Sequence, residues 1–388
     1  MLLLAETMLG SLDAKTWAYV GFIALVLGFL ALDLGVFHKE AHEVSMKESV
    51  IWSIVWLTCG LAFSGFVYMA YERHWLGLGL DTPYYSAAGI VRGEVGGFEA
   101  AKQYLTGYIV EKSLAMDNIF VIAIIFSFFA IPAKYQHRVL FWGIIGALVM
   151  RGAMIGMAGT LVAKYMWVLI IFGAFLILTS IKMAVVKSDG DPSKNPVVRI
   201  VQKIFPVVTF FDGQKFLTKR TVAPTYSKND KGVFVQDPPP PGTLGARWAV
   251  TPLFLALVMV EVTDLVFAVD SIPAIFAITP DPFIVFTSNI LAILGLRALY
   301  FCLAALIAKF RFLKPALILI LAFVGVKLML LATPPYLNTI GSWIGQTWAE
   351  RPSIKIDTTV SLLAVLATLA AAVVLSVAMP AKPKQVAP

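Results

Sequence analysis

The chain has 388 residues, of which 59% are hydrophobic and only 14% are charged, and its formal net charge is +8. Soluble domains carry about 25% charged residues, so this composition excludes an ordinary soluble protein and predicts extensive contact with lipid. The positive charge does not indicate nucleic-acid binding. Most Lys and Arg residues lie in segments between apolar runs, where membrane topology alone would place them.

Apolar segments long enough to cross a bilayer recur along the whole chain, since about 20 apolar residues span the hydrocarbon core as a helix. Nine segments meet this length, at residues 17–37, 50–71, 105–130, 138–160, 165–186, 249–278, 283–308, 312–333 and 358–379. The first residues lack the basic and apolar regions of a signal peptide, so we expect no cleavage there. We predict an all-α, polytopic transmembrane helix bundle of about nine spans.

One long, basic segment divides the spans into two groups. Residues 1–186 form an N-terminal membrane half with five spans, and residues 249–388 form a C-terminal half with four. The intervening residues 187–248 include the run Pro238–Pro241 and resemble a solvated linker. With the N-terminus outside, the inner segments hold 19 Lys and Arg residues and the outer segments hold 7. This bias predicts an outside N-terminus, a cytoplasmic C-terminus and a cytoplasmic Pro-rich loop.

Six acidic residues interrupt the predicted spans: Asp33, Glu111, Asp117, Glu261, Asp264 and Asp270. Each charge at a helix centre costs about 2.5–3.5 kcal/mol on the insertion scale, so such residues are expected to face the bundle interior and to mark an ion or proton path. Three of them crowd the sixth span, and Pro273 follows closely. We predict a break in that helix between Asp270 and Pro273, which would free backbone carbonyls to coordinate a cation.

Two of the acidic segments resemble each other. EKSLAMDNIF (Glu111–Phe120) and DLVFAVDSIP (Asp264–Pro273) both begin with an acid, place Asp six positions later, and continue with Asn or Ser and then Ile. An arginine follows in the next span of each, Arg151 and Arg297. The two spans run in opposite directions in the predicted topology. This pattern predicts an inverted repeat of the third-to-fifth and sixth-to-eighth spans, with a site at the repeat interface.

Two interpretations of these acids are open. They could form buried ion pairs with Arg151 and Arg297 that only fix packing, because a buried pair alone is weak evidence of function. Alternatively, they hold a cation. Carboxylate, amide and hydroxyl oxygens favour hard cations such as Mn²⁺, Mg²⁺ or Ca²⁺. The two cysteines, Cys59 and Cys302, are interpreted as packing residues, and His38 and His42 as part of a solvated turn.

The segments Glu261–Phe301 and Glu111–Ile122, together with Asp33 in ALDLGVFHKE, resemble the TerC family of bacterial membrane proteins, and the longer Alx-type members most. The resemblance implies a transporter-superfamily fold, a multi-pass protein of the bacterial inner membrane and a role in metal homeostasis, with manganese export as in Alx-type members. Matching positions carry over as candidate metal-handling residues: Glu111, Asp117, Asn118, Glu261, Asp264, Asp270, Ser271 and, with less weight, Asp33.

The sequence and the resemblance together indicate a secondary exporter of a divalent cation, with Mn²⁺ as the first candidate. We expect the protein to lie in the lipid bilayer and to use protons as the counter-ion. We find no phosphate-binding glycine-rich loop, no nucleophile–base set and no zinc motif, so we expect neither an enzyme nor a resident cofactor. One alternative is a non-transporting membrane partner protein for metal or tellurite stress, or for membrane protein assembly, which docks through residues 187–248. Amino-acid export is a third interpretation.

Overall fold

The long helices confirm the predicted all-α, polytopic membrane bundle. The computed structural model describes residues 13–35, 45–86, 89–185, 200, 203–222, 225–228, 234–236, 244–304, 312–343 and 354–379. Within that part, eight helices are long and apolar enough to cross a membrane. Their outward-facing side chains are hydrophobic: Ile51 is 61% exposed, and Leu178 and Val374 are each 64% exposed. Such a surface is stable only against lipid.

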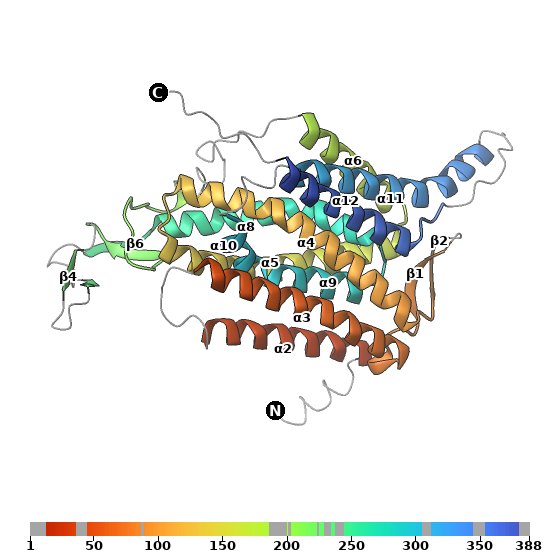
Figure 1. Cartoon of the computed structure of the whole chain (residues 1–388), viewed down its shortest axis with the longest axis horizontal. Coiled ribbons are helices and arrows are strands. Elements are labelled where there is room, and N and C mark those ends of the chain that lie inside the picture. Colours follow the sequence, from red (N-terminus) through yellow and green to blue (C-terminus); the bar gives the residue numbers. More distant parts are fainter. Residues whose placement is uncertain are drawn as a thin grey trace.

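The N-terminal half contains five long helices and one hairpin. Its elements are α2 (Ala14–Gly35), α3 (Met46–Glu72), the short η1 (Trp75–Gly77), β1 (Thr82–Ser86), β2 (Gly89–Gly93), α4 (Gly97–Phe128), α5 (Ala133–Lys164) and α6 (Val168–Val185). The strands β1 and β2 pair antiparallel. In Figure 1, α2 and α3 lie along one side of the bundle.

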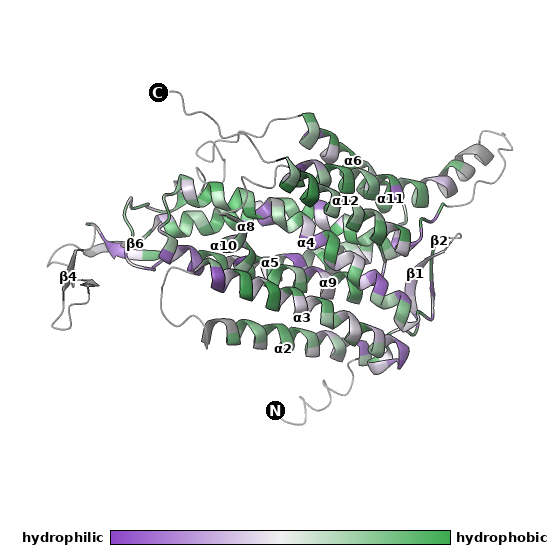
Figure 2. Cartoon of the chain, in the orientation of Figure 1, coloured by the Kyte–Doolittle hydropathy of each residue, from purple (hydrophilic) through white to green (hydrophobic). Residues whose placement is uncertain are grey.

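Four short strands precede the C-terminal half: β3 (Leu217–Arg220), β4 (Tyr226–Lys228), β5 (Phe234–Gln236) and β6 (Leu244–Val250). The half itself contains α8 (Pro252–Phe276), α9 (Pro282–Leu294), α10 (Leu296–Ala304), α11 (Leu313–Trp343) and α12 (Thr358–Ala378). In Figure 1, α11 and α12 lie with α6 on the side opposite α2 and α3. Figure 2 shows hydrophobic colour along the long helices and hydrophilic colour concentrated at the two ends that carry the strands.

The third predicted span is α4, which is not among the eight apolar helices. It is 32 residues long, but it carries charged residues near its centre, including Glu111, Lys112 and Asp117. It packs against α3, α8 and α9, which places it inside the bundle. Glu111 therefore lies within the protein, where it can find a partner, as an acid in a membrane span must.

The predicted break in the sixth span is wrong. Helix α8 runs without interruption through Asp270 and Pro273 to Phe276. The proline lies close to the end of the helix, and the N–H of Ala277 donates to its carbonyl. One missing hydrogen bond near a helix end costs less than a mid-helix break, and packing in a membrane bundle tolerates it.

The break occurs instead in the seventh predicted span, at Gly295 between α9 and α10. A side chain at Gly295 would meet the Cβ of Trp56 at 2.8 Å and the Nζ of Lys112 at 2.9 Å, so glycine permits this close approach. Lys112 donates a hydrogen bond of 3.0 Å to the carbonyl of Ala292. An ammonium group thereby caps the C-terminal end of α9, where the partial charge of a helix favours a cation.

The long segment between the halves is not wholly an irregular linker. Strand β3 pairs antiparallel with β6, and β4 pairs with β5. The run Pro238–Pro241, which we expected to be extended, lies outside the described residues.

The packing of the two halves has the symmetry that the repeat predicts. In the predicted repeat, α4 corresponds to α8, α5 to α9 and α6 to α11. The contact between α4 and α9 has its counterpart in the contact between α8 and α5. Each helix also contacts its own counterpart: α4 contacts α8, α5 contacts α9 and α6 contacts α11. The equivalent helices α4 and α8 start at opposite ends of the bundle, one after β2 and the other after β6 (Figure 1). The contact of α6 with α11 is reciprocal, because a Cβ at Gly173 or at Gly325 would lie 3.0 Å from the carbonyl of the other. These contacts support an inverted repeat.

The start of α9 is fixed by a buried carboxylate. Asp281 caps α9 through the N–H of Phe283 at 2.9 Å and accepts a hydrogen bond of 2.6 Å from the hydroxyl of Tyr71 on α3. Tyr85 also binds this turn, donating to the carbonyl of Phe276. Burial raises the pKa of Asp281, and the hydrogen bond from Tyr71 opposes that rise.

We predict that Tyr71→Phe destabilises the protein, because the buried Asp281 then loses its side-chain donor. A buried polar group left without its partner costs about 1–3 kcal/mol. The free energy of unfolding in mixed micelles measures this loss. Tyr68→Phe is the control, since Tyr68 lies on the same helix and is 43% exposed. Equal stability of the two variants would contradict the proposed role of the Tyr71–Asp281 bond.

Candidate functional site: a buried arginine between the repeats

The polar centre of the bundle is the guanidinium of Arg151, which α5 places between the two repeats. The side chain is 1% exposed. It forms an ion pair with Glu111 of α4. Two parallel hydrogen bonds also join it to Asp264 of α8, from Nε at 3.0 Å and from Nη2 at 2.7 Å. This two-pronged geometry suits a guanidinium and a carboxylate, and it is stronger than a single bond.

Two neutral side chains complete the network. Arg151 Nη1 donates to Asn289 Oδ1 of α9 at 3.1 Å and lies 3.3 Å from Ser271 Oγ of α8. Asn289 in turn donates to Glu111 at 3.2 Å. All five groups are buried. Two carboxyl groups therefore face one guanidinium in this network.

The network joins equivalent positions of the repeat. Glu111 and Asp264 open the two matching motifs and are 153 positions apart, and the same separation relates Asn118 to Ser271. Of the two arginines that follow the motifs, Arg151 binds both acids. The other, Arg297, has its Nη1 atom 2.6 Å from the Nε2 of His137.

A small cavity lies where the two repeats meet. Its volume is about 30 Å³. Its lining comes from α4 (Leu114, Asn118), α8 (Phe267, Asp270, Ser271), α6 (Met183) and α11 (Leu317, Leu321). Leu114 and Phe267 are also 153 positions apart, as are Asn118 and Ser271. Equivalent residues thus face the same space, as expected at a pseudo-two-fold axis, and the space is large enough for about one water molecule or ion.

The oxygen donors at this cavity are of the hard type. Asp270 contributes a carboxylate, Asn118 an amide and Ser271 a hydroxyl. Thr179 of α6 donates a hydrogen bond of 3.0 Å to Asp270, which fixes the orientation of the carboxylate. Ser271 also belongs to the Arg151 network, so the cavity and the network adjoin each other.

A second small space lies on another side of α8. Its volume is about 20 Å³. Asp264 and Arg297 contribute its charged groups, and residues of α4, α5 and α9 supply most of the remaining apolar wall. Asp264 therefore belongs both to the Arg151 network and to this second space.

Glu261 lies apart from both groups. It is half-buried, and within the described residues its Oε2 atom is buried without a hydrogen-bond partner. Its carboxylate occupies the position that a side chain at Gly146 of α5 would take, so α5 leaves room for the acid by lacking a side chain there.

The candidate metal-handling residues therefore fall into separate groups. Glu111, Asp264 and Ser271 meet at Arg151, while Asn118 and Asp270 meet with Ser271 at the cavity. The side chains of Asp33 and Asp117 lie outside the described part of the structure. Among the described residues, no three His, Cys, Asp or Glu side chains converge as a metal centre. Coordination of a metal by this set stays a prediction.

Three residues at these sites were not predicted from the sequence: Asn289, Thr179 and Lys112 in its capping role. Asn289 lies within TSNILAIL, a span otherwise apolar, and its amide is a signal of the kind that marked the buried acids. Thr179 gave no signal, because an isolated threonine in a span commonly bonds its own helix.

Comparisons with known proteins find a matching family model and several similar chains. The model of the family described as "Integral membrane protein TerC family" matches residues 97–384. An uncharacterized membrane protein of Myxococcus xanthus, STKORF319, is 41% identical over 316 residues, which cover 81% of this chain and 83% of that protein. The Alx protein of Escherichia coli K12, whose name proposes a membrane-bound redox modulator, is 39% identical over 315 residues, covering 80% and 84%. No solved structure matches the chain.

We predict that Arg151→Met is strongly destabilising, because it leaves two buried carboxylates without their cation. Removing one partner of a buried pair costs about 3–5 kcal/mol. The combined variant Arg151→Met with Asp264→Asn is expected to lose less than the sum of the single variants, since one of the stranded charges is then absent. Unfolding in mixed micelles measures each term of this double-mutant cycle.

Lys164→Met provides the control for this cycle, because Lys164 lies at the exposed end of the same helix. Its effect is expected within about 0.5 kcal/mol of zero. Strict additivity in the cycle would show that Arg151 and Asp264 do not interact in the folded protein.

Proposed function

This chain belongs to the TerC family of integral membrane proteins, and from that premise we propose that it is a secondary transporter that exports a divalent metal cation, most of all Mn²⁺. The observation that carries the proposal is the small cavity at the repeat interface. Transporters built from inverted repeats hold their substrate between the repeats, near the middle of the membrane.

The chemistry of the cavity fits a hard cation. Its polar groups are the carboxylate of Asp270, the amide of Asn118 and the hydroxyl of Ser271. Mn²⁺ accepts ligands of these types, whereas thiophilic metals prefer sulfur. The few groups present suit a cation that is held weakly enough to leave again, as transport requires. The choice of Mn²⁺ among hard cations rests on the family resemblance.

Arg151 supplies a means of coupling the cation to the repeats. A divalent cation at Ser271 and a guanidinium 3.3 Å from the same hydroxyl repel each other. Cation binding at the cavity therefore opposes the bridge that Arg151 makes between Glu111 of one repeat and Asp264 of the other. Binding that favours one of two arrangements shifts the population toward it, which is the requirement for alternating access.

Proton exchange is the proposed energy source. Glu261 and Asp270 are partly exposed acids, and neither of them pairs with Arg151 in the described structure. Carboxylates in weakly hydrated positions can take up a proton when a cation leaves. The protein would then exchange one for the other, in an inner membrane with the C-terminus in the cytoplasm.

We predict that Asp270→Asn reduces Mn²⁺ flux at least ten-fold in proteoliposomes, because the only carboxylate that lines the cavity in the described structure loses its charge. Asp13→Asn is the matched control, since Asp13 is exposed at the start of α2. The amount of folded protein in each preparation is measured in parallel.

Full flux in the Asp270→Asn variant would overturn the assignment of the cavity as the transport site. Absence of flux of Mn²⁺, Mg²⁺ and Ca²⁺ in the unaltered protein, under both directions of the proton gradient, would instead favour a non-transporting role. In that case, the phenotype in cells should depend on residues 187–248 rather than on Asp270.

A further inference from the structure

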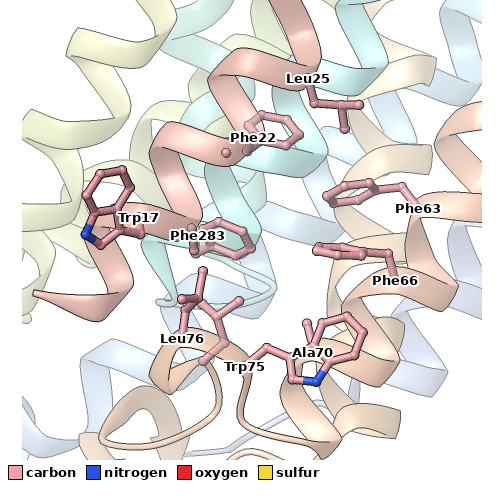
Figure 3. A pocket seen from close by; sticks show the side chains of 12 residues that line it. Trp17, Phe22, Leu25, Phe63, Phe66, Ala70, Trp75, Leu76 and Phe283 are labelled. Carbon is pink, nitrogen blue, oxygen red and sulfur yellow. The ribbon is translucent and has the colours of Figure 1, made fainter.

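A large apolar pocket of the described structure lies away from the polar centre, between α2 and α3. Its volume is about 610 Å³, which is within the range of small-molecule sites. The two helices supply most of its walls, η1 and the residues beside it supply one end, and Phe283 of α9 lies at its floor (Figure 3).

The lining of this pocket is apolar throughout. It consists of Trp17, Ala18, Gly21, Phe22, Leu25, Phe63, Phe66, Ala70, Trp75, Leu76, Leu78 and Phe283. Phe22, Ala70 and Phe283 are buried and form the deep part, whereas Trp17, Leu25 and Phe66 are each about 40% exposed at its edges. The site is therefore a hollow with a solid floor rather than a flat lipid-facing surface.

The pocket lies at one end of the helix pair. It is formed by the first turns of α2 and the last turns of α3, and Trp17 and Trp75 stand at this end. Tryptophan prefers the boundary between the hydrocarbon core and the headgroups. Two cations lie at the same end: Lys15, whose Nζ donates to the carbonyl of Leu80 at 2.6 Å, and the exposed Arg73 that follows α3.

We propose that this pocket binds an acyl chain of a phospholipid from the leaflet that borders the start of α2. The lining offers no polar side chain apart from the indole N–H groups at its edge, so a long hydrocarbon chain fits it better than the polar ring of a quinone. Lys15 and Arg73 lie where a phosphate headgroup would be placed. The α2 and α3 walls lie outside residues 97–384, which the family model matches.

The bound acyl chain would support the beginning of α9. Phe283 follows the capping residue Asp281 and packs edge-on against Tyr19 of α2, with ring centroids 5.2 Å apart. Phe22 contacts Phe63 across the two helices with ring centroids 5.5 Å apart. An acyl chain in the pocket fills the space over these rings and holds α2 against the core.

The test uses the full-length protein in vesicles of phosphatidylethanolamine and phosphatidylglycerol that contain a phospholipid with a photoreactive acyl chain. Gly21→Leu fills the pocket, because a Cβ at Gly21 meets nothing within 4 Å. Gly28→Leu is the matched control: it makes the same change two turns further along α2, also in open space, but outside the pocket lining.

We expect cross-linked peptides to concentrate within residues 17–25 and 63–78, and we expect Gly21→Leu to reduce them at least five-fold while Gly28→Leu leaves them unchanged. Cross-links spread evenly along α2 and α3, or unaffected by Gly21→Leu, would overturn the proposal. So would a co-purified isoprenoid quinone that Gly21→Leu removes, or cross-links between two copies of the chain at this face.

Discussion

The structure depends on one buried interaction, the bridge that Arg151 forms between the two repeats. A guanidinium within a membrane bundle is stable only when carboxylates and neutral acceptors surround it. Glu111, Asp264 and Asn289 supply these partners from three different helices. Helices α4, α5, α8 and α9 must therefore keep their mutual positions, and any movement between the repeats must first change the contacts of this one side chain.

Helix α9 shows how the rest of the protein supports that bridge. Tyr71 of α3 binds its N-terminal cap, Lys112 of α4 binds the carbonyl of Ala292 near its other end, and Asn289 between them binds both Arg151 and Glu111. Lys112 directly follows Glu111 in the chain, so the residue that pairs with Arg151 and the residue that caps α9 are carried by the same turn of α4. The break at Gly295 therefore lies beside the residue that directly follows Glu111 in the chain.

Much of this architecture follows from the sequence, and the exceptions have physical causes. The spans could be predicted because lipid demands long apolar helices, and the repeat because Glu111 and Asp264 open matching motifs. The break was predicted at Pro273 but occurs at Gly295, since a proline near a helix end removes one hydrogen bond, whereas Gly295 admits Trp56 and Lys112. The partners of each acid could not be predicted, because an arginine follows each acidic motif in the next span, and only the packing of α5 brings Arg151 to both acids.

The most direct measurement is the anomalous scattering of Mn²⁺ in crystals of the protein at the manganese absorption edge. The account predicts one strong peak within the cavity lined by Asn118, Asp270 and Ser271, with the guanidinium of Arg151 moved away from Ser271. Peaks confined to the surface, such as at the pair of His74 and Glu94 (3.3 Å apart), with Arg151 in its present contacts, would contradict it.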